Sequence, residues 1–130
     1  TFAQLMQEAE KYIGFPYVWG GSTPSTSFDC SGFVCWAYAY SGVYNLPRTT
    51  AQGIYNQCAP ISRSEAKPGD LVFFTRTYVS SSPVTHIGIY VGDGLMLHCG
   101  DPIKYASIDT DYWTSKFYGF GRLPLGTSAE

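Results

Sequence analysis

Cys30 is the residue of this chain best suited to covalent chemistry. It stands in the segment Phe28–Val34, where a loop rich in Gly, Ser, Thr and Pro gives way to an apolar run of helical character. Free backbone N–H groups and the positive end of a helix dipole stabilise an anion at such a position and lower a cysteine pKa. The pattern therefore predicts a thiolate nucleophile. The competing interpretation is a small buried hydrophobe, the usual role of a free cysteine.

Two histidines could assist that nucleophile. They are His86 and His98, and both lie in a segment typical of a β-hairpin. A cysteine nucleophile needs a base for its proton, and the base needs a third group that fixes its tautomer. A three-residue loop at Gly92–Gly94 would place both imidazoles on one face of the sheet, whereas a two-residue turn would place them on opposite faces. The sequence leaves this register open.

The cysteines do not form the pattern of a disulfide scaffold or a zinc site. Their spacing is irregular, and neither the cysteines nor the histidines make the closely spaced ligand pairs that zinc sites use. The four residues are Cys30, Cys35, Cys58 and Cys99. Cys99 follows His98 in a predicted strand, so its side chain is expected in the core on the opposite face. We expect neither a metal nor another cofactor.

Composition limits the classes of partner. The 130 residues suit one domain, charged residues make up 14% of the chain and the formal net charge is −2. Nothing in this balance indicates a surface for nucleic acid. No apolar run approaches the roughly 18 residues that cross a bilayer, so no membrane insertion is expected. The chain opens on neither Met nor a signal-peptide pattern, which indicates a segment cut from a longer precursor.

The periodicity predicts helices first and strands second, an α+β class. The expected helices are an amphipathic one over 2–13 that ends at Gly14, one over 30–41 with Asp29 as N-cap, and a short one from Thr49 or Thr50 to Gln57. The expected antiparallel strands are 71–74, 84–91, 95–99 and 117–123. Residues 1–125 would form the domain, and 126–130 a polar C-terminal tail.

Five short motifs, in this order, resemble the NlpC/P60 family of bacterial cell-wall peptidases. They are Tyr17–Gly21, Phe28–Val34, Leu46–Thr49, Lys67–Phe74 and His86–Gly92. The resemblance implies a papain-like fold, with N-terminal helices packed on a small antiparallel sheet. It also implies a Cys-His-polar triad that cleaves stem peptides of peptidoglycan, typically between D-glutamate and a diamino acid. Carried over by position, the triad is Cys30, His86 and His98.

The resemblance suggests roles for residues around the nucleophile. Tyr17 matches a tyrosine that could donate to the oxyanion together with a backbone N–H at Cys30, although an ordinary half-buried aromatic fits equally. Asp29 and Ser31 match positions that hold the amino end of a stem peptide in some members, and both also suit helix capping. Trp19 could form a wall of the cleft, and Arg48 is expected to anchor a loop through an ion pair.

The expected protein is a cysteine endopeptidase that cleaves the γ-D-glutamyl bond to meso-diaminopimelate or L-lysine. It would be a secreted, extracellular monomer, tethered to other domains that act on the cell wall. Two alternatives remain open. One is a papain-like amidase or acyltransferase with the same Cys-His pair, and the other is a non-catalytic module that binds the cell wall.

Overall fold

A six-stranded antiparallel sheet forms the frame of the computed structural model, which describes residues 1–125. The predicted tail at 126–130 lies outside the described residues. The sheet order is β3-β8-β4-β5-β6-β7, and a separate ribbon pairs β1 with β2. The strands are β1 Ser22–Thr23, β2 Ser27–Phe28, β3 Ala59–Ile61, β4 Leu71–Thr75, β5 Val84–Gly92, β6 Leu95–Cys99, β7 Ile103–Ser107 and β8 Phe117–Arg122.

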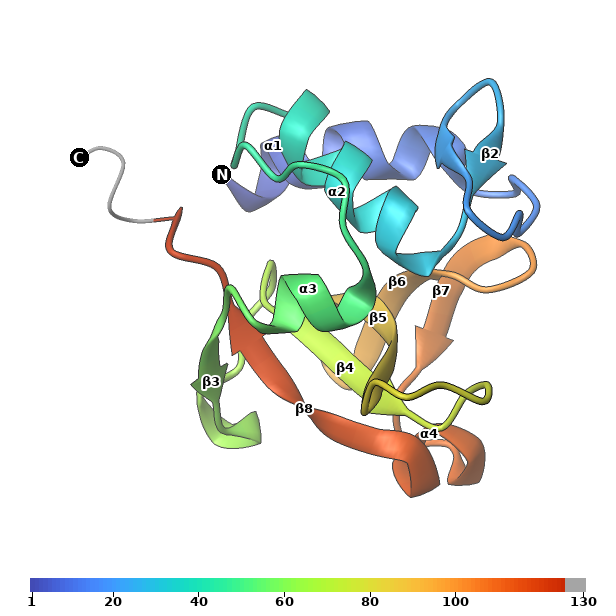
Figure 1. Ribbon diagram of the computed structural model, residues 1–130. Helices are drawn as coiled ribbons and strands as arrows, with labels where there is room; N and C mark the ends of the chain where they lie inside the picture. The colour runs from blue at the N-terminus through green and yellow to red at the C-terminus, as the bar shows by residue number, and fades with distance from the viewer. Residues whose placement is uncertain (126–130) are drawn as a thin grey trace.

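Helices cover both faces of this sheet unequally. Helices α1, α2 and α3 lie together on one side, and α4 lies at the opposite end of the molecule, below β4 and β8 (Figure 1). They are α1 Phe2–Ala9, α2 Cys30–Tyr40, α3 Ala51–Tyr55 and α4 Asp111–Lys116, with 3₁₀ turns at Glu10–Tyr12 and Arg63–Glu65. The predicted α+β class is confirmed. No helix among residues 1–125 is long and apolar enough to cross a membrane.

The N-terminal helix forms as the sequence predicts, with a tighter last turn. Thr1 and Gln4 make a reciprocal capping box at its start, and its apolar stripe is buried against α2. The expected single helix over 2–13 is α1 followed by the 3₁₀ turn at Glu10–Tyr12. The chain then reverses at Gly14, whose φ of +96° lies in the region that glycine adopts most easily.

Helix α2 is the central element and carries Cys30 at its first position. The Asp29 carboxylate accepts a hydrogen bond from the Gly32 amide, as the predicted N-cap requires. Eight of its eleven residues are buried, and it packs on α1, α3, β5 and β6. Gly32 is needed because a Cβ there would lie 2.1 Å from the Gly21 carbonyl oxygen. The loop before α2 therefore lies directly on its first turn.

The sheet separates two apolar clusters because strand side chains alternate between its faces. In β4, Leu71 and Phe73 face the cluster under the three N-terminal helices. Val72 and Phe74 face a second, smaller cluster, against which Trp113 of α4 packs. This second face was not anticipated from the sequence, because α4 and strands β3 and β7 lie outside the predicted elements.

The β5–β6 hairpin resolves the register that decides where the histidines lie. Its turn is the two-residue type, with Gly92 opposite Leu95 and positive φ values of 56° at Asp93 and 73° at Gly94. Of the two turns that the sequence left open, the structure contains the two-residue one. A β-bulge between Tyr90 and Gly92 shifts the pairing by one residue, so Tyr90 faces Met96. The bulge restores the register in which both imidazoles share a face.

Candidate active site

The sulfur of Cys30 lies against the backbone of β5 at His86. Its side chain is 6% exposed, and Sγ is 3.7 Å from the carbonyl oxygen of Thr85. The backbone N–H of Ile87 is directed to the same sulfur. Thr85 and Ile87 are the two neighbours of His86 in the chain, so the start of α2 is inserted beside that residue. The structure thus brings together the predicted nucleophile and the predicted base.

Cys30 is a thiol at neutral pH in this structure. Burial raises its pKa to about 12, and the nearby Asp29 carboxylate acts in the same direction. The backbone N–H groups of Ile87 and Ser31 lower the pKa, but by less. Burial therefore works against the thiolate that the sequence predicts. The helix start is in place, but desolvation of the sulfur outweighs the effect of its amides.

His86 and His98 form a buried, hydrogen-bonded pair. His86 Nε2 lies 2.9 Å from His98 Nδ1, and the ring planes are at 83°. Burial lowers the pKa of His86 to about 3, with a smaller contribution from His98. Burial also lowers the pKa of His98 to about 4, with a contribution from Lys104 on β7. Both rings are therefore neutral at physiological pH.

The hydrogen bond between the rings restricts the tautomers that could support catalysis. If His86 Nε2–H donates to His98 Nδ1, the other nitrogen of His86, Nδ1, is free to accept a proton. His98 then carries its proton on Nε2, an atom that is buried and has no hydrogen-bond partner among residues 1–125. The opposite arrangement would leave His86 protonated on Nδ1 and unable to act as a base there.

Gly88 provides the space that this pair occupies. It lies opposite His98 across the hairpin, and a Cβ at this position would be 2.6 Å from Met96 Sδ and 3.2 Å from His98 Cβ. A side chain here would displace the Met96 or His98 side chain. The glycine within the motif His86–Gly92 thus has a specific steric reason.

Trp113 contacts both histidines and was missed by the sequence reasoning. Its ring stacks on His86 with centroids 5.0 Å apart and planes at 24°, and it meets His98 edge-on at 5.4 Å. It belongs to α4, which no motif marks. The one available signal was Thr110, a helix N-cap whose hydroxyl accepts from the Trp113 amide.

Asp29 is the centre of a polar network beside the nucleophile. One carboxylate oxygen accepts from the Gly32 amide at 2.7 Å and from Ser31 Oγ at 3.1 Å. The other accepts from the Gly20 amide at 3.0 Å and from Arg48 at 2.9 Å. Arg48 also donates to Ser31 Oγ at 2.8 Å. The expected anchoring role of Arg48 is confirmed, and Asp29 and Ser31 both serve the helix start.

Aromatic side chains border the nucleophile. Tyr17 is half-buried; burial raises the pKa of its phenol, and proximity to Cys30 raises it further, so it remains a hydrogen-bond donor. Trp19 is 69% exposed and meets Tyr78 edge-on with centroids 5.0 Å apart. These two rings connect the loop before α2 to the loop between β4 and β5.

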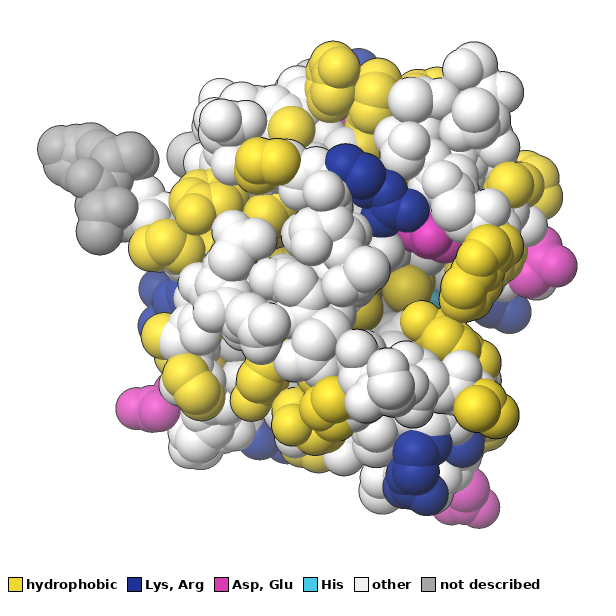
Figure 2. Space-filling view, viewed as in Figure 1, with side chains coloured by type: hydrophobic (Ala, Val, Ile, Leu, Met, Phe, Trp, Pro, Cys, Tyr) yellow, Lys and Arg dark blue, Asp and Glu magenta, His cyan; other side chains and the backbone are white. Residues whose placement is uncertain are grey.

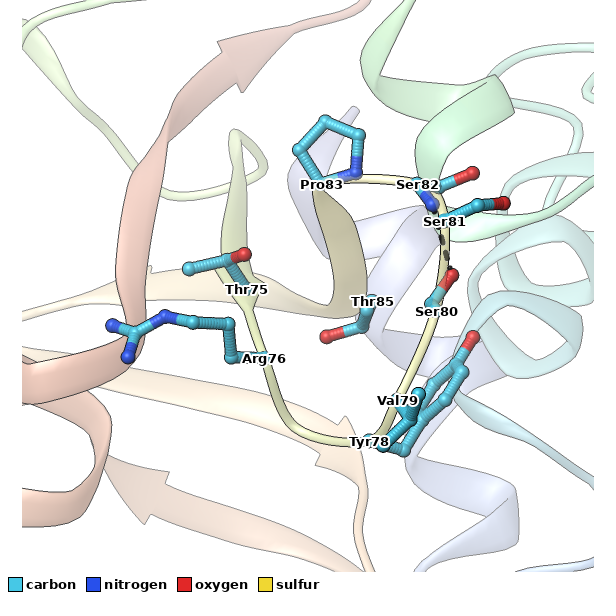
Figure 3. Close-up of a pocket in the computed structure, with 9 residues that line it drawn as sticks. All are labelled: Thr75, Arg76, Tyr78, Val79, Ser80, Ser81, Ser82, Pro83 and Thr85. Carbon is cyan, nitrogen blue, oxygen red and sulfur yellow. Dashed lines mark hydrogen bonds between the residues drawn. The ribbon is translucent and has the colours of Figure 1, made fainter.

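The β4–β5 loop encloses a pocket of about 410 Å³ next to this site. Figure 3 shows Thr85 directed into the loop, with Ser80–Ser82 on one side and Arg76 pointing away. Thr85 is shared by the two regions, because its carbonyl oxygen contacts Cys30. In Figure 2 a histidine is visible deep in a hollow, beside an acidic, a basic and several hydrophobic side chains. A histidine side chain is therefore reached from a hollow of the surface.

Metal ligands do not gather here or elsewhere in residues 1–125. No group of three or more His, Cys, Asp or Glu side chains in that range is placed to hold a metal ion. The four cysteines are free, and Cys99 is fully buried, with its thiol 3.2 Å from the carbonyl oxygen of Phe28. Cys99 therefore lies in the core, as predicted. The chemistry available to this site is that of a thiol with two imidazoles.

The profile of the NlpC/P60 family matches residues 14–122. The chain belongs to the NlpC/P60 family. A crystal structure of an NLP/P60-family protein similar to a lipoprotein, from Staphylococcus aureus, superposes with a TM-score of 0.90 at 45% identity. That match covers 94% of this chain and 41% of the other. The predicted papain-like α+β fold is confirmed for this NlpC/P60 domain.

Two curated relatives connect this NlpC/P60 domain to named enzymes. The bifunctional muramidase/DL-endopeptidase CwlT of Bacillus subtilis is 47% identical over 94% of this chain and 36% of its own length. The murein DD-endopeptidase MepH of Escherichia coli is 44% identical over 92% of this chain and 44% of its own length. The chain therefore spans less than half the length of each of these relatives.

Proposed function

We propose that this chain is the catalytic domain of a cysteine endopeptidase that hydrolyses stem peptides of peptidoglycan at the γ-D-glutamyl bond to a diamino acid. The observation that carries the proposal is the buried pair His86–His98 together with the Cys30 sulfur, which lies against the backbone on both sides of His86. A thiol beside a neutral imidazole that is oriented by a second polar ring is the arrangement of a cysteine peptidase.

The first half of the reaction is acylation of Cys30. As the sulfur attacks the carbonyl carbon, Nδ1 of His86 takes the thiol proton, so charge separates only during the attack. The Tyr17 hydroxyl and the Cys30 backbone N–H are the proposed donors to the oxyanion. The imidazolium of His86 then gives its proton to the leaving amine. A thioester remains on Cys30 and the amino fragment is released.

The second half is hydrolysis of that thioester. Water occupies the position of the released amine and transfers a proton to His86 as its oxygen attacks the thioester carbonyl. Collapse of the second tetrahedral intermediate expels the sulfur, which regains the proton from His86. His98 keeps the His86 ring in the required orientation throughout. Neither step requires a metal ion.

The substrate assignment is supported by relatives and by the polar network beside Cys30. A DL-endopeptidase cuts after a D residue and before an L residue, as at the bond from D-glutamate to a diamino acid, and CwlT carries that name. Asp29 and Ser31 would receive the amino end of the stem, and Trp19 would form a wall. MepH is named a DD-endopeptidase, so a bond between two D centres is the second candidate.

Two other classes of function are alternatives to the proposed peptidase. An amidase or acyltransferase would use the same Cys-His pair with a different acceptor. A binding module of the cell wall would not need Cys30, His86 and His98 to be brought together. We also propose that the domain acts as an extracellular monomer within a longer protein, which accords with the lengths of its relatives.

Mass spectrometry of digested stem peptides tests the proposal. The protein is incubated with a stem tetrapeptide of either diamino acid, with a cross-linked dimer of stem peptides and with casein. Release of L-alanyl-D-glutamate supports the γ-D-glutamyl assignment, release of stems from the dimer identifies a DD-endopeptidase, and cleavage of casein alone refutes both. Cys30→Ala should abolish product formation.

Cys35→Ala is the matched control for that substitution. Cys35 lies on the same helix and is also buried, but its thiol donates to the carbonyl oxygen of Pro47, away from the histidines. Its variant should retain turnover. Full activity in Cys30→Ala would overturn the assignment of the nucleophile.

A further inference from the structure

The proposed reaction needs a cation in an environment that disfavours one. His86 must become an imidazolium in both half-reactions, yet burial lowers its pKa to about 3. The titratable group that acts on it directly is the ring of His98, and Lys104 further disfavours a proton on His98. Asp29 and Arg48 influence Cys30 from the helix side. No carboxylate among residues 1–125 hydrogen-bonds to either imidazole.

Trp113 is the group that could offset this cost. Its ring stacks on His86 at a centroid distance of 5.0 Å with planes 24° apart, so the π face of the indole is turned to the imidazole. The face of an aromatic ring carries negative charge density and attracts cations within about 6 Å, and Trp attracts them most strongly. This attraction is stronger in a desolvated site. A neutral imidazole gains much less from the same contact.

The position of this indole is set by contacts on several sides. Thr110 caps the helix through the Trp113 amide, and the Phe74 ring lies 4.5 Å from the indole, centroid to centroid. The end of α4 is tied to the β4–β5 loop, because Lys116 donates to the Arg76 carbonyl and Arg76 donates to the Ser115 carbonyl. The indole is therefore held over the imidazole before any substrate binds.

We propose that Trp113 is a positioning residue that holds His86 and stabilises its imidazolium during the reaction. The inference rests on the proposed function in that His86 is taken as the base. It also assigns a purpose to α4, an element that carries none of the five sequence motifs. The competing role for Trp113 is that of an apolar cover over the histidines.

The two roles predict opposite shifts in the pKa of His86 when Trp113 is removed. If Trp113 only covers His86, its removal hydrates the ring and raises the pKa of His86, because desolvation is what lowers it. If Trp113 stabilises the cation, its removal lowers the pKa of His86. The measurement needs a starting pKa well above 3, so that the folded protein can be titrated in both directions.

The substitution Cys30→Asp provides that starting point. It places a carboxylate against the backbone of His86, and a nearby carboxylate raises the pKa of an imidazole. The chain has two histidines, so NMR of the ring Cε1 protons follows both without ambiguity. The Cys30→Asp protein is titrated alone and in combination with Trp113→Leu or Trp113→Phe. Tyr112→Leu is the control, since Tyr112 is the neighbour of Trp113 on α4 and is 50% exposed.

We expect Trp113→Leu to lower the pKa of His86 by about one unit, Trp113→Phe to lower it by less, and Tyr112→Leu to leave it unchanged. An unchanged or raised pKa in Trp113→Leu would overturn the proposal. If the Leu variant fails to fold, the direction of the His86 pKa shift in Trp113→Phe distinguishes the two roles. The titration involves no substrate, so its outcome is independent of whether stem peptides are cleaved.

Discussion

Lowering the pH from 8 to 5 should destabilise this domain strongly because it holds two neutral histidines. The pKa values of His86 and His98 are about 3 and about 4, against 6.5 for an unperturbed histidine. At pH 5 the unfolded chain has bound a proton on each ring and the folded protein has not. At a pH 1.5 units below the unfolded-state pKa, protonation of one ring in the unfolded chain lowers the free energy of unfolding by about 2 kcal/mol. The pair therefore lowers it by about 4 kcal/mol.

The direction of the stability change follows from the direction in which both histidine pKa values are shifted. A folded-state pKa below the unfolded value means that full stability is present above pH 6.5 and is lost as the pH falls toward the folded pKa values. Other shifted groups act outside this window. The carboxyls of Glu8 and Asp109 have pKa values lowered from 4.5 and 3.8, and the cysteines have pKa values raised from 9. A loss of about 4 kcal/mol is large against the 5–15 kcal/mol of a typical domain.

Urea unfolding followed by circular dichroism at pH 8, 7, 6 and 5 measures this dependence. The control is the double variant His86→Gln/His98→Asn, in which an amide nitrogen and an amide oxygen replace the bonded Nε2 and Nδ1 without a titratable group. We expect its free energy of unfolding to be nearly constant from pH 8 to 5. A wild-type change below about 1 kcal/mol, or an equal slope in the double variant, would refute the reasoning.

Three further predictions test the site by substitution. Tyr17→Phe should lower turnover by roughly 100- to 1,000-fold if the hydroxyl is an oxyanion donor, whereas unaltered kinetics would assign the ring to packing. His86→Ala should lower kcat more than His98→Ala, because the base moves protons and its partner orients it; the reverse order would exchange their roles. Gly88→Ala should lower the free energy of unfolding by about 1–3 kcal/mol in urea, and it should lower kcat because the Met96 or His98 side chain must move. Gly119→Ala is the control and should change neither quantity, since a Cβ there has nothing within 4 Å.

Local rules of the backbone account for the parts of the fold that the sequence predicted well. The apolar spacing near the N-terminus, the N-cap at Asp29 and the turn residues Asp93 and Gly94 each act within a few positions of the chain. Because these rules are local, they do not predict contacts between segments that are distant in the chain. Strands β3 and β7 and helix α4 are short, and few of their side chains are buried, so the sequence shows no apolar periodicity there.

The histidine pair illustrates where sequence reasoning reached its limit. The sequence placed both imidazoles in one hairpin, but a one-residue slip in pairing would have sent them to opposite faces. The bulge between Tyr90 and Gly92 decided the register. The pKa of Cys30 also reversed the expectation, because desolvation depends on how many atoms surround the sulfur.

The sequence by itself determined which reactive groups exist. It also determined that Cys30 begins a helix and that the two histidines share a hairpin, because capping, turn chemistry and side-chain alternation are properties of neighbouring residues. Only the tertiary structure decided that the sulfur lies beside His86, that His86 bonds to His98 and that Trp113 stacks on His86. These contacts join segments far apart in the chain. Their geometry and electrostatics arise from burial, which is a property of the packed fold.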